Sequence, residues 1–410
     1  MDALRLTVIW HPRLACGKNI AEEITETFDR LGMVRDDVRL SVPVQVRSIG
    51  FDELDGAPRP IDFSKAQIDG LILLSDRHMA VAANKKWKPF FDSISQEKMN
   101  NESKIFIINI ASDRRGIKLP ITEEINVIKT FVNKLDDPED SVKRHIFIKL
   151  IANIVINVKK CRQYNHISRK TPPMVPPETI FISYASRDGA EIAECIDKYV
   201  RINNATLGIH TFLDEKSLPG GLEHRKYFSG QIQDSSLLVI YTDTYSSREY
   251  CRWELLEAKR HRRPILAISI LERGEDRVFP YAGNIPSLIV RRKKPARSPL
   301  WKRLFRSGRH AAPIDEADAE VVVQELLSEV LRSLLFNLQA EKMAKERGIV
   351  DPIILPRPPE LLDIAFASDT FRPGADAVQI IYPDPPLDII EQAILRSSNP
   401  AIAFKSLSEI

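Results

Sequence analysis

The sequence predicts an α/β protein built around parallel sheets, and three observations lead to this prediction. Short, continuous apolar runs, typical of strands buried on both faces, alternate with segments in which apolar residues recur at helical spacing. The same order of runs occurs before and after a Pro-rich stretch, TPPMVPP (171–177). The length of 410 residues exceeds one comfortable core, since a domain takes roughly 100 to 200 residues. We therefore expect two or three domains.

The first block, residues 1–165, has the pattern of an α/β domain. Its apolar runs predict three strands, in RLTVIWHP (5–12), DGLILLSD (69–76) and SKIFIINIA (103–111). Helical spacing predicts two helices, in GKNIAEEITETFDRLG (17–32) and PEDSVKRHIFIKLIANIVINVKKCR (138–162). A Pro-rich linker, 166–177, is expected to end this domain.

The second block, residues 178–310, repeats this order. Strands are predicted in ETIFISYAS (178–186), GIHTFLD (208–214), DSSLLVIYTD (234–243) and RPILAISIL (263–271), and a helix in DGAEIAECIDKYV (188–200). Residues 17–24 and 189–196 share five of eight residues. An internal duplication explains this identity, and chance similarity between two amphipathic helices is the alternative.

Two further segments follow the second block. A long helix is predicted within 311–348, where Leu and Val are frequent from residue 318 onward. The Pro-rich segment 349–410 predicts extended chain, a strand, a helix and a last strand. This α/β segment is too short for an independent sheet domain, so we expect it to dock onto one of the larger units.

Composition excludes several kinds of function. A net charge of +3 gives no sequence-wide indication of a nucleic-acid or membrane partner. The basic run 290–310 could bind nucleic acid or a nucleotide, although a solvated connector is the preferred interpretation. The four cysteines lie far apart, so neither a metal site nor a redox motif is predicted. No leader peptide, long apolar window or phosphate-binding loop is evident, and a cytoplasmic protein is expected.

Three motifs of the second block indicate a known family. In chain order they are Phe181-Ile182-Ser183-Tyr184 with Asp188 behind it, Phe212-Leu213-Asp214, and Tyr250-Cys251 followed by Glu254-Leu255. In this order and spacing they resemble the bacterial branch of the Toll/interleukin-1 receptor (TIR) domains, over about 120 of the 410 residues. The resemblance implies a flavodoxin-like parallel sheet for residues 178–310.

The resemblance implies two competing roles. Some TIR domains are adhesive modules that stack through the loop after the Phe-Leu-Asp strand. Others, particularly in prokaryotic defence, cleave NAD+ at the nicotinamide-ribose bond with a glutamate of the aromatic-Cys-x-x-Glu helix. That glutamate is Glu254 here. NAD+ would be the substrate, and no further cofactor is implied.

One carboxylate is chemically adequate for this reaction. The departure of nicotinamide leaves an oxocarbenium-like ribose, and the pyridinium is a good leaving group because it becomes neutral. A carboxylate that holds the ribose hydroxyls and stabilises the positive charge therefore suffices, whereas ordinary glycosidases need two. The alternative is that Glu254 is a solvated helix residue. Glu257, three and four residues before Arg260 and His261, is expected to form ion pairs.

Other candidate residues surround this glutamate in the predicted fold. Tyr250 shares a helix face with Glu254, whereas Cys251, Leu255 and Ala258 form the stripe expected to face the sheet. Ser183, Tyr184, Arg187 and Asp214 are predicted at the carboxyl edge of the sheet, where open α/β folds bind ligands. Tyr184 could stack on the substrate or pack in the core. Asp188 is expected to cap the following helix.

The loop SLPGG is the candidate assembly loop. It comprises Ser217, Leu218, Pro219, Gly220 and Gly221. Pro restricts and Gly releases the backbone, which suits either a substrate lid or a stacking contact between copies.

The first block lacks an equivalent glutamate. Alignment on Trp87 places Lys88 or Phe91 at the critical position, with Asp92 one residue out of register. We interpret this block as a non-catalytic copy, or another flavodoxin-like fold, with a sensing or assembly role. The leading hypothesis is an NAD+-cleaving effector of prokaryotic antiphage defence, activated by self-association and by a partner protein or signalling nucleotide. The rivals are a non-catalytic TIR scaffold and a nucleic-acid-binding protein.

Overall fold

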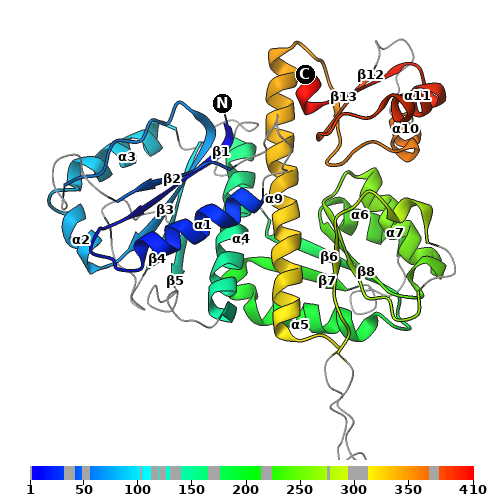
Figure 1. The fold of residues 1–410 in the computed structure, drawn as a ribbon, viewed down its shortest axis with the longest axis horizontal. Helices are drawn as coiled ribbons and strands as arrows, with labels where there is room; N and C mark the ends of the chain where they lie inside the picture. Colours follow the sequence, from blue (N-terminus) through cyan, green and yellow to red (C-terminus); the bar gives the residue numbers. More distant parts are fainter. Residues whose placement is uncertain are drawn as a thin grey trace, which may run out of the picture. The chain divides into compact units, whose positions relative to one another are not determined.

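The apolar runs form parallel sheets in two separate units of the computed structural model (Figure 1). The structure describes residues 2–31, 42–48, 56–101, 104–111, 119, 126–129, 140–164, 176–213, 224–274, 278–293, 313–368 and 378–410. The first unit comprises Met1–Pro176, Leu331–Val350 and Ile410, and the second comprises Pro177–Val330 and Asp351–Glu409. The boundary at Pro176 and Pro177 falls within the Pro-rich stretch.

The sheet of the first unit has the strand order β2-β1-β3-β4-β5, with every neighbouring pair parallel. The strands are β1 (Asp2–Trp10), β2 (Val44–Arg47), β3 (Ala66–Ser75), β4 (Ile105–Ala111) and β5 (Asn126–Lys129). All residues of β4 are buried, as a strand covered on both faces requires. The edge strands β2 and β5 have four residues each and were not predicted.

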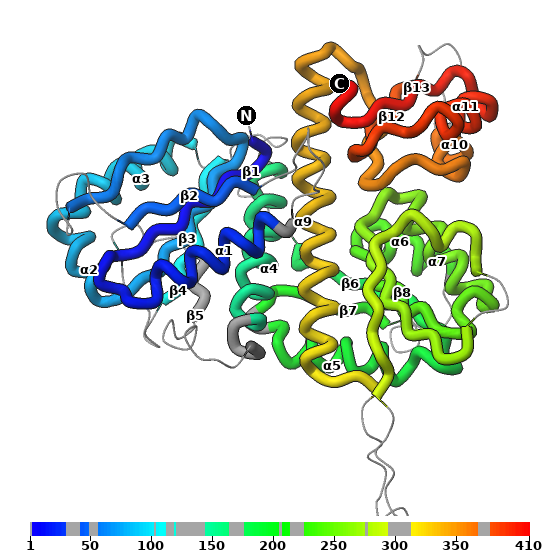
Figure 2. The backbone as a smooth tube through the Cα atoms, in the orientation of Figure 1, coloured from blue at the N-terminus to red at the C-terminus, as the bar shows by residue number. Residues whose placement is uncertain are grey.

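Helices cover this sheet. They are α1 (Gly17–Leu31), α2 (Arg77–Ala83), α3 (Lys88–Asn100) and α4 (Asp140–Tyr164), and the tube in Figure 2 follows them along the chain. On one sheet face Leu71 and Ile107 pack with Trp87 and Phe91, which begin α3. Strand side chains alternate between faces, and the even-numbered Ile72 is buried as well. Both faces are therefore covered.

The sheet of the second unit has the strand order β10-β9-β8-β6-β7. Its parallel strands are β6 (Glu178–Tyr184), β7 (Ile209–Leu213), β8 (Ser236–Tyr241), β9 (Ile265–Ser269) and β10 (Ser287–Ile289). Numbered within its own unit, each sheet reads 2-1-3-4-5, which is the flavodoxin-like order. The predicted α/β fold class is confirmed.

Helices α6 and α7 cover one face of this second sheet. The helical elements here are α5 (Ala190–Leu207), α6 (His224–Gln233), η4 (Tyr245–Ser247), α7 (Glu249–Arg260) and η5 (Pro280–Ala282). Phe228 of α6 and Leu255 of α7 pack with Phe181 and Val239 from the strands. The predicted buried stripe of α7 is confirmed, since Cys251, Leu255 and Ala258 are all buried.

The last part of the chain adds a long helix and a small sheet. Helix α9 (Glu316–Glu346) contributes its first half to the second unit and its second half to the first. The elements after it are β11 (Ile353–Ile354), α10 (Leu361–Ser368), β12 (Val378–Tyr382), α11 (Ile389–Ser398), β13 (Ile402–Ser406) and η6 (Leu407–Glu409). Strands β11, β12 and β13 form a parallel sheet grouped with the second unit. Helix α10 was not predicted.

A glycine packs against an aromatic residue at the start of the first helix in both units. A Cβ on Gly17 would lie 2.2 Å from Cδ1 of Trp10, the last residue of β1. A Cβ on Gly189 would lie 3.1 Å from Cβ of Tyr184, the last residue of β6. The two glycines begin the matched octapeptides, which thus occupy equivalent places in the two sheets. This agreement supports the hypothesis of an internal duplication.

Candidate active site

The candidate site lies at the carboxyl ends of β6 and β8 in the second unit. These strands are neighbours in the sheet although β7 separates them in sequence. Such a reversal of strand order is the place where open α/β sheets bind ligands. Ser183 and Tyr184 end β6, while η4 and α7 follow β8.

Glu254 is buried at this edge. The residue is only 2% exposed, and the hydroxyl of Ser183 donates a hydrogen bond of 2.5 Å to its Oε2. The alternative of a solvated helix residue is therefore wrong. A hydrogen bond to a carboxylate is about twice as strong as one between neutral groups, so Ser183 fixes the orientation of this side chain.

Tyr245 completes the hydrogen-bonded group, and sequence analysis missed it. Its hydroxyl lies 2.8 Å from Oγ of Ser183 and 3.1 Å from the backbone oxygen of Cys251, to which it can donate. Burial, assisted by Cys251 and Glu254, raises the pKa of Tyr245 well above its ordinary value. The phenol therefore keeps its proton. The signal in the sequence was an aromatic residue four positions after β8, ahead of the Glu254 helix.

Glu257 contacts both partners predicted for it, Arg260 as an ion pair and His261 as a hydrogen-bond partner. Its carboxylate lies 3.2 Å from Nε2 of His261 and 3.8 Å from Nη1 of Arg260. Glu257 is nevertheless only 8% exposed, and Ser229 of α6 donates a 2.5 Å hydrogen bond to it. Of the two buried carboxylates of α7, Glu254 thus bonds to the strand edge and Glu257 to helix α6.

Tyr250 lies on the exposed side of α7, in contrast to Glu254. It is 48% exposed, and the guanidinium of Arg225 lies 5.8 Å from the centre of its ring. Arg225 also approaches Trp253 and forms an ion pair with Glu249. The shared helix face therefore does not give Tyr250 and Glu254 the same environment.

The residues after β6 occupy different environments. Tyr184 is half-buried, and its backbone oxygen accepts a hydrogen bond from the thiol of Cys251. Arg187 is exposed. A guanidinium near the carboxyl edge of a sheet is available to an anionic ligand.

Asp188 does not cap helix α5, so that interpretation was wrong. The N-cap residue is Gly189. The carboxylate of Asp188 instead accepts hydrogen bonds of 2.7 Å from the hydroxyls of Thr242 and Thr244, and one of 3.1 Å from the backbone N–H of Thr244. These three donors, which follow β8, hold the Asp188 carboxylate away from the start of α5. Asp188 therefore links the loop after β6 to the loop after β8, and both loops border the site.

Some predicted features lie outside the described residues. They are Asp214, the candidate assembly loop of Ser217, Leu218, Pro219, Gly220 and Gly221, and most of the basic run 290–310.

Metal and thiol chemistry receive no support from the described part of the chain. There, no three His, Cys, Asp or Glu residues are grouped so that they could hold a metal ion. All four cysteines are free thiols, and burial raises the pKa of Cys161 to about 12. None of the described helices has both the length and the apolar character needed to cross a membrane.

Comparison with known proteins gives no further identification. No protein-family model matches the chain, and no curated protein is significantly similar to it.

Proposed function

We propose that the second unit cleaves the nicotinamide-ribose bond of NAD+, with Glu254 as the catalytic residue. The observation behind this proposal is the Glu254 carboxylate, buried where the strand order reverses and oriented by Ser183. The resemblance of the surrounding motifs to TIR domains adds the reaction and the substrate.

Burial makes the carboxylate suitable for stabilising positive charge. The attraction between Glu254 and the oxocarbenium-like ribose is stronger in a site of low dielectric constant than in water. The carboxylate is already oriented by Ser183, so little reorganisation accompanies the reaction. Exposed Arg187 would contact the diphosphate, and Tyr184 and Tyr250 would offer rings to the nicotinamide or the adenine.

The same burial implies that the enzyme must open before it acts. NAD+ can reach Glu254, which is nearly inaccessible, only after the residues covering the carboxylate move. Coupling of this movement to self-association would keep the enzyme silent in a cytoplasm rich in NAD+. An antiphage effector activated by a partner protein or a signalling nucleotide fits this behaviour.

A non-catalytic TIR scaffold is the second candidate, and the burial of Glu254 favours it too. A carboxylate bonded to Ser183 and close to Tyr245 can simply stabilise the packing of α7 on the sheet. The two candidates differ in one respect. A structural carboxylate leaves NAD+ intact, whereas a catalytic one releases nicotinamide.

Nicotinamide release from NAD+ tests the proposal. The full chain is incubated with NAD+ over a dilution series, while light scattering follows its association. We expect turnover per subunit to rise with concentration as the protein associates, because association is coupled to the movement that opens the site. Associated protein that releases no nicotinamide would favour the scaffold.

A further inference from the structure

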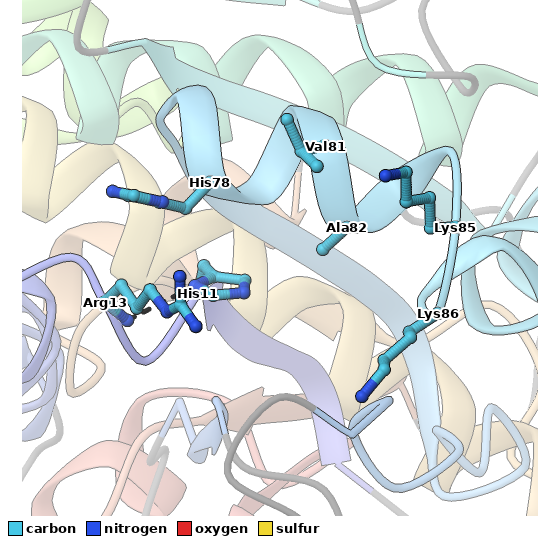
Figure 3. Close-up of a pocket in the computed structure, with 7 residues that line it drawn as sticks. All are labelled: His11, Arg13, His78, Val81, Ala82, Lys85 and Lys86. Atoms are coloured by element: carbon cyan, nitrogen blue, oxygen red, sulfur yellow. Dashed lines mark hydrogen bonds between the residues drawn. The ribbon is translucent and has the colours of Figure 1, made fainter.

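A basic pocket lies at the corresponding place in the first unit, and the proposed NAD+ chemistry does not involve it. Figure 3 shows the side chains that line it, and its volume is about 220 Å³. The basic lining residues are His11, Arg13, His78, Lys85 and Lys86, and Val81 and Ala82 complete the wall. His11 directly follows β1, and His78 lies in the first turn of α2 after β3. Strands β1 and β3 are neighbours where the order of this sheet reverses, the usual ligand position in such folds.

The charge of the pocket selects an anion. Arg13, Lys85 and Lys86 carry positive charges at neutral pH, and no lining residue is acidic. Positive charges around one hollow attract an anion. Guanidinium and ammonium groups are the side chains that proteins use to bind phosphate.

The histidine side of the pocket is held in place by ring contacts. The buried His11 ring lies between His78 and Trp87, with centroid distances of 5.8 and 5.3 Å. Its Nδ1 accepts a hydrogen bond of 3.2 Å from the backbone N–H of Arg13. The neutral imidazole therefore carries its proton on Nε2. These contacts fix His11 and the backbone of Arg13 before any ligand binds, which lowers the entropic cost of binding.

The pocket has room for more than a phosphate ion. A volume of about 220 Å³ is far more than one water molecule needs. Figure 3 shows Val81 and Ala82 between the histidine side and the lysine side. This apolar wall suits the carbon skeleton of a ligand rather than a second charged group.

We infer that this pocket binds a small phosphate ester. Lys85 and Lys86 hold the phosphate, while the organic part lies against Val81 and the His78 ring, on the side of the pocket that Arg13 lines. The first unit thus has a ligand of its own, whether or not the second unit cleaves NAD+.

Titration calorimetry of the full chain with ribose 5-phosphate tests the assignment. Ribose 5-phosphate has neither the adenine nor the nicotinamide of NAD+, so we expect little binding to the proposed NAD+ site of the second unit. Ribose 5-phosphate should bind more tightly than inorganic phosphate, ribose should not bind, and added salt should weaken binding. Absence of binding, equal affinity for ribose, or affinity no greater than that for inorganic phosphate would overturn the assignment.

A pair of double variants locates the binding. Lys85→Ala with Lys86→Ala should weaken ribose 5-phosphate binding about tenfold or more, since two charge-assisted contacts are lost. Lys65→Ala with Lys104→Ala removes the same charge from exposed positions of the same unit outside the pocket, and affinity should not change. Arg13→Ala provides an independent variant. Wild-type affinity in both the Lys85/Lys86 and the Arg13 variants would contradict the proposal.

Discussion

Ser183 is the side chain that orients Glu254. Removing its hydroxyl distinguishes an effect on the orientation of the carboxylate from an effect on the stability of the fold. Ser183→Ala leaves a buried carboxylate without that donor, which should lower the free energy of unfolding by about 1 to 3 kcal/mol. If the proposed chemistry is correct, turnover of NAD+ should fall about tenfold or more because the carboxylate is no longer fixed. Urea denaturation and nicotinamide release measure the two effects.

Ser229→Ala is the matched control. It removes a hydrogen bond of the same length to Glu257, the other carboxylate buried on α7. Stability should fall by a comparable amount while turnover is retained. Equal losses of turnover in both variants would mean that Ser183 acts only through the stability of α7.

The sequence motif made Glu254 the candidate catalytic residue, but the environment of that residue was beyond sequence analysis. Helical spacing places Tyr250 and Glu254 on one face, yet one is exposed and the other buried. Burial depends on what packs against each side of α7, and Glu254 lies against Ser183 of β6. Tyr245 and the Thr partners of Asp188 approach the site from the segment after β8, so spacing along α7 or β6 could not reveal them.

At the level of elements, the C-terminal segment is bonded to α7. The fully buried Lys259 side chain donates hydrogen bonds of 2.8 and 3.0 Å to the Glu360 carboxylate and one of 3.0 Å to the backbone oxygen of Gly283. Burial lowers the pKa of Lys259, and Glu360 opposes this effect. Beside it, Arg357 forms an ion pair with Asp363 at 2.8 Å.

Lys259→Ala should lower the free energy of unfolding by about 2 to 4 kcal/mol, because Glu360 loses its nearer cationic partner in a largely buried place and keeps the more distant Arg357, 3.8 Å away. Arg260→Ala, at the next position, removes a half-exposed pair with Glu257 and should cost less than about 1 kcal/mol. Urea denaturation followed by circular dichroism measures both values. Similar costs for the two variants would show that the pair with Glu360 does not stabilise the second unit.

Elements with long apolar runs could be predicted, and short or Pro-flanked ones could not. The runs that gave β3, β4, β6 and β8 are continuous because those strands are buried on both faces. Edge strands such as β2 and β10 are short and partly exposed, so they leave little apolar signal. The Pro-rich sequence before residue 361 predicted extended chain, and helix α10 was therefore missed.

At the scale of the whole molecule, two sheets of the same strand order have different side chains at the same edge. The first unit has a basic pocket where β1 and β3 end, and the second has a buried glutamate beside β6 and β8. The repeated octapeptide led to the hypothesis of a duplication. It could not indicate the pocket. His11 is far from His78 and Lys85 in the sequence, and the strand order, which brings them to one edge of the sheet, was not known.

The central claim is that the molecule has one catalytic carboxylate, Glu254, and that the first unit has none. Nicotinamide release from NAD+ is therefore compared among wild type, Glu254→Gln, Glu257→Gln and Asp92→Asn, with circular dichroism confirming each fold. Glu254→Gln removes the charge at nearly constant volume and should abolish release, a loss of about a thousandfold or more. Glu257→Gln should retain most of the activity, and Asp92→Asn all of it. Near wild-type release by Glu254→Gln, or its loss in Asp92→Asn, would contradict the account.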